Sequence, residues 1–559
     1  MQAAFCAIML HEATAWGHGL AGKLVNLYNA RFRVVWALVF LGLVFLAWRN
    51  RFIQDDAFIS FRYARNLVEG NGLVWNPGEH VEGYTNFLWT VLIAGGMKLD
   101  LDPVLFSEIL GLICFGLTLV FTYKLARLVF SPNWALLTML LLGTNYSFSA
   151  YATGGLETQL QALIFTATMY LLFGVMKGER KYSTMAIISL LLSAGLLTRL
   201  DSAILAAVVI PIIVYQLLKE KSGMQVKVAK ELLLVIPLVA IISVWFAWKL
   251  SYYGDILPNT YYAKAGAGVD PMMGLRYVYG FFTEYWLAPF LLLVGAAMYF
   301  KREAGLGAIF IITVLWLAYI VKAGGDFMEF RALIPILPFV MLLIVRSVAW
   351  ASSNKAVQAA LAIAILIGSL LYAVRSSESS LETVSPANAY DTESIQQLQD
   401  HLTDNSSDWG SVGKVLGESL QYSQQVKIAV LPAGAVPYFS RLPALDMLGL
   451  SDQWVARRGV VSSTMPGHHR KATLPYLMLK NVNLIVGKPA MVPSDVPLSD
   501  ALARLDSYKF FAVRNWSDLP PGTKAIAIPV NEGYKAVILY IRPNPVIDQA
   551  IADNGWEVY

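Results

Sequence analysis

Apolar runs long enough to cross a lipid bilayer recur through the first two thirds of this chain, and no other feature limits its fold as strongly. Several runs are shorter than the ~20 residues of a typical spanning helix, so flanking aromatic residues and helix tilt must complete them. The pattern predicts a polytopic α-helical membrane protein with about eleven transmembrane helices. The runs are Val34–Trp48, Val104–Tyr123, Ala135–Ser149, Leu160–Val175, Met185–Thr198, Ala203–Leu218, Leu232–Trp248, Tyr285–Phe300, Leu306–Val321, Ala332–Val348 and Ala356–Ala373.

The composition agrees with a membrane protein and excludes several other classes. Of the 559 residues, 57% are apolar and only 14% are charged, whereas soluble domains average about 25% charged residues. The net charge of +5 does not indicate a nucleic-acid partner, because the basic residues fall in short clusters between apolar runs. The two cysteines, Cys6 and Cys114, are too far apart for a metal-binding motif and offer no disulfide framework.

Clusters of lysine and arginine predict the orientation in the membrane. If the N-terminus is cytoplasmic, all these clusters fall on the cytoplasmic side, and the eleventh span leaves the C-terminus outside. We therefore interpret residues 1–33 as a cytoplasmic leader. The clusters are Lys23/Arg31/Arg33, Lys124/Arg127, Lys177/Arg180/Lys181, Lys219/Lys221/Lys227/Lys230, Lys301/Arg302 and Arg346/Lys355.

One further apolar segment, Tyr84–Met97, could be counted as a twelfth span. Counting it would place the clusters at 177–181 and 219–230 outside, against the positive-inside rule. We therefore predict that it forms a helix that lies along the outer surface or dips into it.

The composition changes near Ser376, where the apolar runs stop and polar residues and short β-rich runs begin. We divide the chain into the leader (1–33), a transmembrane domain (34–375) with a first outer loop (49–103), and a soluble α/β domain (376–559) on the outer face. The predicted strands are Val426–Leu431, Asn483–Val486, Ala525–Pro529 and Lys535–Ile541.

Two adjacent carboxylates, Asp55 and Asp56, follow the first span and open the most informative stretch of the chain. Charge beside hydrocarbon is costly unless it faces water or a partner, so acids in this position indicate a functional site. The alternative is structural, because aspartate commonly caps a helix such as the one predicted from Ala57. Capping needs only one of the two acids, so both roles can hold.

The spacing over Ala57–Leu67 predicts an interfacial helix with Phe58 and Phe61 in the lipid and Arg62 and Arg65 above it. A turn follows at 75–78, and further polar side chains then converge on one predicted pocket. Candidate substrate-binding residues in this loop are Arg62, Tyr63, Trp75, Asn76, Glu79, Glu82, Tyr84 and Asn86.

These groups suit the transfer of a sugar from a lipid phosphate. An acceptor hydroxyl has a pKa far above neutral, so a positioned carboxylate must take its proton as it attacks the anomeric carbon. The departing phosphate needs Arg or Lys to receive its negative charge, and the lipid tail needs an apolar groove open to the bilayer. The sequence contains no Gly-rich nucleotide fingerprint, which argues against a soluble nucleotide-sugar donor.

Three later residues, Glu157, Arg199 and Asp201, emerge on the same predicted face as the two acids. Glu157 could instead cap the start of a helix, and Arg199 could form a structural ion pair with Asp201. The functional alternative is that all three form a wall of the donor site.

Two other outer loops add further candidates. Tyr261 and Lys264 suit sugar stacking and phosphate contact, although an interfacial tyrosine belt would give the same pattern. Arg331, at the head of a span, is a candidate phosphate ligand, with snorkelling to the interface as the alternative. The adjacent His468 and His469 lack further metal ligands, and we interpret them as surface residues of an acceptor-facing loop.

The motifs of the first outer loop resemble those of GT-C glycosyltransferases, and above all the terminal β-(1→2)-arabinofuranosyltransferases of bacterial cell-wall polysaccharide assembly. The motifs that carry this resemblance are Asp55–Ala64, Gly72–Glu79, Val81–Trp89, Thr153–Thr158, Thr198–Asp201 and Pro443–Leu450. The resemblance implies a multi-pass enzyme of the bacterial inner membrane. It also implies an inverting transfer from a polyprenyl-phosphoryl sugar, with Asp55 or Asp56 as general base. We favour Asp55, because Asp56 is better placed to open the helix.

The expected partners are a polyprenyl-phosphate-linked sugar donor, a glycan or glycoconjugate acceptor and the bilayer, with no nucleic acid. The family donor is decaprenyl-phosphoryl-arabinofuranose, but the motifs do not visibly encode the sugar, and assistance by a divalent cation is left open. The alternatives are a transporter or flippase of a lipid-linked sugar, and a polysaccharide polymerase or ligase. A transporter would place charges at the bilayer midplane and show paired repeats, whereas these charges lie at the ends of the spans.

Overall fold

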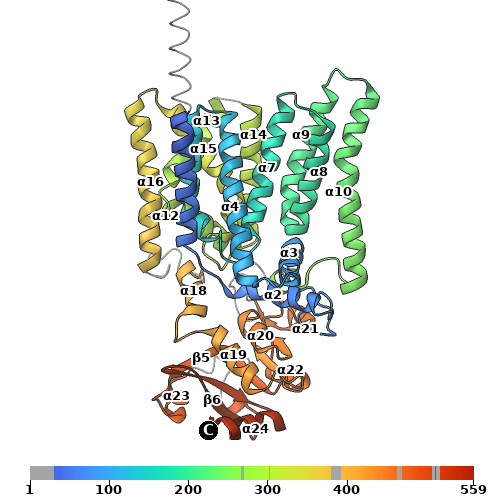
Figure 1. Cartoon of the computed structure of the whole chain (residues 1–559), viewed down its shortest axis with the longest axis vertical. Helices are drawn as coiled ribbons and strands as arrows, with labels where there is room; N and C mark the ends of the chain where they lie inside the picture. Colours follow the sequence, from blue (N-terminus) through green and yellow to red (C-terminus); the bar gives the residue numbers. More distant parts are fainter. Residues whose placement is uncertain are drawn as a thin grey trace, which may run out of the picture.

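The protein has a helical bundle at one end and a smaller domain with a β-sheet at the other (Figure 1). The computed structural model describes residues 30–265, 270–300, 303–378, 392–461, 469–505, 510 and 516–559. The leader predicted over 1–33 lies almost entirely outside the described residues.

Within the described residues, eight helices of the bundle are long and apolar enough to cross a membrane. Helices α12 and α13 together meet the same criterion as a ninth, although they are bent by 97° where they join. Short 3-10 turns, η1 (Leu200–Ser202) and η2 (Arg331–Ile336), lead into α9 and α15. The bounds are Ala30–Arg49 for the first described helix, Pro103–Arg127 for α4, Thr158–Met176 for α7, Ala203–Leu218 for α9, Met224–Tyr253 for α10, Pro271–Glu284 for α12, Ala288–Phe300 for α13, Ala304–Lys322 for α14, Leu337–Ala351 for α15 and Lys355–Glu378 for α16.

Two of the predicted spans fall on shorter helices. Met185–Thr198 corresponds to α8 (Tyr182–Thr198), and Ala135–Ser149 is divided between α5 (Pro132–Gly143) and α6 (Tyr146–Ala150). The division occurs at Asn145, whose side chain accepts a hydrogen bond from the Phe148 amide and so starts a new helix. The number of crossings, about eleven, therefore stays a prediction.

The first outer loop forms two helices, α2 (Asp55–Val68) and α3 (Phe87–Lys98). Gln54 caps α2 by accepting a hydrogen bond from the Asp56 amide, so both aspartates lie in the first helical turn. Helix α3, on the segment expected at the outer surface, packs on α2 and reaches α4 and the end of α8 (Figure 1).

The aromatic side chains of α2 do not face lipid. Phe58 and Phe61 are buried, and both rings contact Tyr438, which belongs to the C-terminal domain. The expectation that these rings lie in the bilayer is therefore wrong. The helical spacing correctly predicts an apolar face on α2, but a protein domain covers that face.

The C-terminal domain is built on a mixed six-stranded sheet with the order β2-β1-β5-β7-β6-β8. Strand β1 is parallel to β2 and β5, whereas β7 is antiparallel to β5 and β6. The four predicted strands are present as β1, β5, β6 and β7. The strands are β1 (Ile428–Val430), β2 (Ala444–Asp446), β3 (Val460–Val461), β4 (Arg470–Lys471), β5 (Leu484–Pro493), β6 (Lys524–Asn531), β7 (Tyr534–Tyr540) and β8 (Glu557–Val558).

Helices cover the sheet and connect it to the bundle (Figure 1). Strands β3 and β4 form a separate antiparallel ribbon. The helices are α18 (Ile395–Thr403), α19 (Trp409–Ser419), α20 (Ala435–Ser440), α21 (Gln453–Arg458), α22 (Leu474–Leu479), α23 (Leu498–Arg504) and α24 (Pro545–Asn554).

Candidate functional site

A cavity of about 760 Å³ lies where the bundle, the first outer loop and the C-terminal domain meet. Helices α8, α10 and α14 contribute mainly apolar side chains to its wall, and α7 contributes Thr158 and Gln161. The first loop, the short helix α11 (Asn259–Ala265) and the turn before η2 contribute mainly polar ones. An apolar wall with a few convergent polar groups is typical of a ligand site.

Asp56 is the only one of the two adjacent acids that lines this cavity. Burial raises the pKa of the Asp56 carboxyl, and the positive charges of Arg331 and Lys264 offset part of that effect. Across the described residues, its carboxylate makes no hydrogen bond or ion pair, although both cations are close enough to act on it. Asp56 is therefore a partly desolvated acid that no bond to the described residues fixes in place.

Two cations, Lys264 and Arg331, line the cavity near Asp56 and keep donors that no protein acceptor satisfies within the described chain. With the described part of the chain, Arg331 makes one bond, from Nε to Asp326 Oδ2 at 2.6 Å. Lys264 makes no hydrogen bond or ion pair with the part of the chain that the structure describes, and burial and the Arg331 charge lower its pKa. Two like charges held close together in a partly buried wall form a suitable site for an anion.

The turn before Arg331 has a backbone that few residues adopt. Gly324 and Gly325 have φ values of +79° and +85°, and Phe330 has φ +47°. A side chain at Gly325 would also meet Tyr277 at 3.0 Å. The pair of glycines therefore allows a tight turn, and the turn brings Asp326 onto Arg331.

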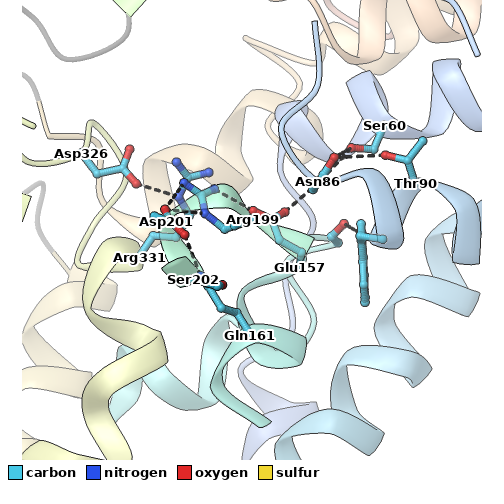
Figure 2. A network of polar contacts seen from close by, with 12 residues as sticks. Ser60, Asn86, Thr90, Glu157, Gln161, Arg199, Asp201, Ser202, Asp326 and Arg331 are labelled. Carbon is cyan, nitrogen blue, oxygen red and sulfur yellow. Dashed lines mark hydrogen bonds and ion pairs between the residues drawn. The ribbon is translucent and has the colours of Figure 1, made fainter. Parts of the chain in front are cut away.

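A network of polar contacts joins residues that line the cavity (Figure 2). Arg199 bridges two acids, with Nη1 at 2.8 Å from Glu157 Oε1 and Nη2 at 2.9 Å from Asp201 Oδ2. Burial opposes ionisation of Glu157, but the charges of Arg199 and Arg331 hold its pKa below the ordinary value. This network makes the site rigid. Because two acids neutralise Arg199, its charge is less available to a ligand than the charges of Lys264 and Arg331.

The same network reaches the helix that carries Asp56. Asn86 donates to Glu157 Oε2 at 2.8 Å and to Ser60 Oγ at 3.1 Å (Figure 2). Ser60 lies four residues after Asp56 and so shares its face of α2. The Asn86 amide therefore joins the cavity face of α2 to the start of α7.

On another part of the wall, Glu82 pairs with Lys249 Nζ at 2.7 Å. Lys249 lies in the last turns of α10, and its side chain is fully buried. The neighbouring Tyr84 hydroxyl contacts the Tyr253 hydroxyl at 3.1 Å. These contacts fix the loop at 82–84 to the end of α10.

Asp55 lies outside the cavity and faces the C-terminal domain. Its Oδ1 accepts from the Ala435 amide at 2.7 Å and its Oδ2 accepts from the Gly434 amide at 3.1 Å. Burial raises the pKa of Asp55 to about 7. A Cβ at Gly434 would meet the Asp55 backbone oxygen at 1.9 Å, so only glycine allows this approach.

Five other candidates of the first loop also lie away from the cavity. Arg62 donates to the carbonyls of Pro437 and Leu442. Arg62, Tyr63, Trp75, Asn76 and Glu79 together form a surface that we call the docking face of the first loop. Trp75 Nε1 donates to Ala433 O, Asn76 Nδ2 donates to Ala444 O and Glu79 Oε2, and Tyr63 donates to Val81 O.

The cavity brings together the remaining candidates that the sequence singles out. They are Asp56, Glu82, Tyr84, Asn86, Glu157, Arg199, Asp201, Tyr261, Lys264 and Arg331. Whether these residues bind substrate stays a prediction.

Sequence reasoning missed several residues that line or support the cavity. Lys249 had a usable signal, because a lysine inside the apolar end of a span needs a buried partner. His469 was expected at the surface but is only 3% exposed, so that expectation is wrong, while His468 lies outside the described residues. The missed residues are Gln161, Lys249, Tyr319, Asp326, Leu450 and His469.

Within the described part of the chain, no group of three or more His, Cys, Asp or Glu side chains could hold a metal ion. A divalent cation was left open by the sequence, and the described residues offer no cluster to which it could be assigned.

Comparisons with known proteins show which proteins this chain resembles in sequence and in fold. Residues 394–559 match a family model described as a domain of unknown function (DUF8728). The terminal β-(1→2)-arabinofuranosyltransferase of Mycobacterium tuberculosis is 27% identical over 260 residues, 43% of this chain and 39% of the relative. The enzyme of the same name from Corynebacterium glutamicum is 27% identical over 347 residues, 54% of this chain and 48% of the relative. The matched part is thus less than half the length of each relative.

Among solved structures, ArnT from Cupriavidus metallidurans bound to undecaprenyl phosphate superposes with a TM-score of 0.54. The match covers 91% of this chain and 98% of ArnT, at 15% sequence identity. The chain therefore has the GT-C membrane fold, with a C-terminal strand-containing domain, as the sequence predicts.

Proposed function

We propose that this protein transfers a sugar from a polyprenyl-phosphate carrier to a glycan or glycoconjugate acceptor. One observation carries the proposal: an acid without a bond to the described chain, Asp56, shares one cavity wall with two incompletely paired cations, Lys264 and Arg331. The cavity also takes apolar side chains from the membrane helices, as a lipid-linked donor requires.

Asp56 is the proposed general base, in place of the Asp55 that the sequence favoured. The acceptor hydroxyl must lose its proton as it attacks the anomeric carbon, and a carboxylate with a raised pKa accepts that proton more readily than an ordinary one. Asp55 is already occupied by two backbone amides of the C-terminal domain. Of these two acids, only Asp56 can reach a substrate in the cavity.

Lys264 and Arg331 are the proposed ligands of the donor phosphate. As the sugar leaves, the phosphate gains negative charge, which two nearby cations stabilise. Burial and, after it, repulsion by Arg331 lower the pKa of Lys264, and an anion between the two cations would relieve that repulsion. ArnT from Cupriavidus metallidurans binds undecaprenyl phosphate, which is consistent with a lipid phosphate in this fold.

The names of the two relatives support arabinofuranose as the sugar. Inversion at the anomeric carbon rests on the sequence resemblance alone. The sequence resemblance implies a bacterial inner membrane, and the charge of the loops predicts that the N-terminus is in the cytoplasm. The cavity and the C-terminal domain are then on the outer face.

The test is transfer by the purified full-length protein from synthetic polyprenyl-phosphoryl-arabinofuranose, compared with polyprenyl-phosphoryl-glucose. We expect transfer of arabinofuranose, and a rise of about tenfold or more in the donor KM of Lys264→Gln because one cation is lost. The control is Lys98→Gln, which removes an exposed lysine at the end of α3 and should leave the donor KM unchanged. Lipid binding by the wild type without transfer of either sugar would contradict the proposal and favour a transporter.

A further inference from the structure

The backbone that leads into Arg331 is bound to the C-terminal domain. Met328 and Glu393 form a parallel bridge between the turn before η2 and the segment before α18. The Glu329 amide donates to Glu393 O at 3.0 Å, and the Glu393 amide donates to Phe327 O at 2.7 Å. The turn that carries one proposed phosphate ligand is therefore attached to the start of the C-terminal domain.

The side chain of Glu329 adds a second attachment, and it is fully buried. Its Oε1 accepts from the Tyr372 hydroxyl of α16 at 2.6 Å, and more weakly from Ser147 Oγ of α6 at 3.4 Å. Its Oε2 accepts from the amide of Ile395, the first residue of α18, at 2.8 Å. One carboxylate therefore joins two helices of the bundle to the first described helix of the C-terminal domain.

Phe330, between Glu329 and Arg331, has a backbone conformation that needs such support. Its φ of +47° lies in the left-handed region, which residues other than glycine seldom adopt. Strained backbone of this kind persists only where the surrounding structure over-determines it. The buried Phe330 ring packs against Tyr277 and Phe281, with ring centroids 5.7 Å and 5.3 Å away. The Phe330 ring and the Glu329 carboxylate thus fix the turn from which the Arg331 side chain departs.

Arg331 depends on that turn for its direction. Within the described chain its guanidinium is held only through Nε, by Asp326 (Figure 2). The side chain lines the cavity, so its two Nη groups are the donors that a phosphate can meet. A two-pronged contact with a phosphate requires a defined orientation of the guanidinium plane. A shift of the turn would therefore weaken this contact without removing any charge from the cavity.

We infer that Glu329 is a positioning residue for the donor phosphate, and that it acts by joining the turn of Arg331 to α18. Glu329 does not line the cavity, so it acts through Arg331 and not by touching the donor. The C-terminal domain thereby influences the affinity for the lipid phosphate through a contact outside the cavity. This inference rests on the proposed function, because it requires Arg331 to bind the phosphate.

The test measures binding of undecaprenyl phosphate to the purified full-length protein. Arg331→Gln removes the ligand and should weaken binding about tenfold. Glu329→Ala leaves the Ile395 amide without its acceptor, and should weaken binding by a similar factor of about ten. Glu329→Gln can still accept from the Ile395 amide and can donate to the Tyr372 hydroxyl. It should therefore bind within about twofold of the wild type.

A double variant separates positioning from general damage to the fold. If Glu329 acts through Arg331, then Glu329→Ala combined with Arg331→Gln should bind undecaprenyl phosphate no more weakly than Arg331→Gln alone. Glu329→Ala combined with Lys264→Gln should instead show both losses in full, because Arg331 is still present and loses its position. Losses that multiply in the combination with Arg331→Gln overturn the inference.

A second pair of variants removes the same contact from the side of the C-terminal domain. Ile395→Pro deletes the amide that donates to Glu329. Proline is tolerated at this first position of α18, and Ser394 before it already has the extended backbone that proline requires. Ile395→Ala, the matched control, also loses the buried side chain but keeps the amide.

We expect weaker undecaprenyl phosphate binding in Ile395→Pro than in Ile395→Ala, and this pair decides the question if Glu329→Ala does not fold. Equal binding in the two Ile395 variants overturns the inference. A wild type that binds no undecaprenyl phosphate, or an Arg331→Gln variant that binds it as tightly as the wild type, counts against the proposed function and removes the basis of this inference.

Discussion

Asp55 and Asp56 are neighbours in the first turn of α2, yet one is bound to the C-terminal domain and the other faces the cavity. Successive residues of an α-helix point about 100° apart, so adjacent side chains lie on different faces. Asp55 shares its face with Arg62, seven residues later, and Asp56 shares its face with Ser60. A single acidic motif therefore serves two surfaces, and residues close in sequence do not share one role.

The largest effect of a single substitution, a loss of turnover, is expected at Asp56 on the cavity side of α2. Asp56→Asn removes the proposed base, so turnover should fall by about 10² to 10⁴ while the protein stays folded. Initial rates of sugar transfer, with the apparent melting temperature measured on the same preparation, check this. Glu69→Gln, at an exposed acid just after α2, is the control and should keep full turnover. Equal loss in both variants would mean that surface charge, and not the base, limits the reaction.

The second-largest effect, a loss of stability, is expected at Arg62 on the docking face of the first loop. Arg62→Gln leaves buried carbonyls of Pro437 and Leu442 without their donors, so stability should fall by about 3 kcal/mol. Arg65→Gln is the matched control, because Arg65 donates to a single carbonyl, that of Tyr438, and is only partly buried. Chemical denaturation in detergent checks the ranking. An equal loss of stability in Arg65→Gln and Arg62→Gln would show that the positive charge of α2, and not its hydrogen bonds to the C-terminal domain, stabilises the protein.

A smaller effect is the pH dependence of stability that Asp55 contributes. Its pKa is about 7 in the folded protein and about 3.8 when unfolded, so the folded state holds its proton over that interval. Stability from this group is fully present below about pH 4 and is lost as the pH rises through 7. Asp55→Asn should therefore flatten the fall in melting temperature between pH 4 and 7.

Part of that pH slope should survive in Asp55→Asn, because burial also raises the pKa of Asp446 to about 6. The unaltered protein, measured in the same buffers, is the reference. An identical slope in the variant and the unaltered protein would mean that Asp55 is ionised in the folded state across the whole range.

The sequence was most informative about the membrane part. Periodicity and length identify its apolar helices, because each helix satisfies its own backbone hydrogen bonds and its pattern is local. The exception is Ala135–Ser149, where Asn145 interrupts a segment that is apolar on average. Four strands of the C-terminal sheet were also predictable, whereas β2 and the short strands β3, β4 and β8 give too few residues for a pattern.

The candidate site could be predicted only in part. Asp56 and Arg331 were found because each lies beside the end of a predicted span, and Lys264 was found because it lies among the tyrosines of an outer loop. The choice between Asp55 and Asp56 could not be made, since the amides that occupy Asp55 belong to Gly434 and Ala435, about 380 residues later. The same separation explains why Phe58 was placed in lipid, since the Tyr438 ring that it contacts is also 380 residues later. Contacts between domains leave no local pattern in the sequence.

The central claim is that the two neighbouring acids do different work, and the most direct test compares Asp55→Asn with Asp56→Asn in one experiment. Turnover is measured together with amide hydrogen exchange at Gly434 and Ala435, the two amides that bond Asp55. We predict faster exchange at both amides and retained turnover in Asp55→Asn, and unchanged exchange with lost turnover in Asp56→Asn. Lost turnover in Asp55→Asn with both amides still protected, beside an active Asp56→Asn, would contradict the account.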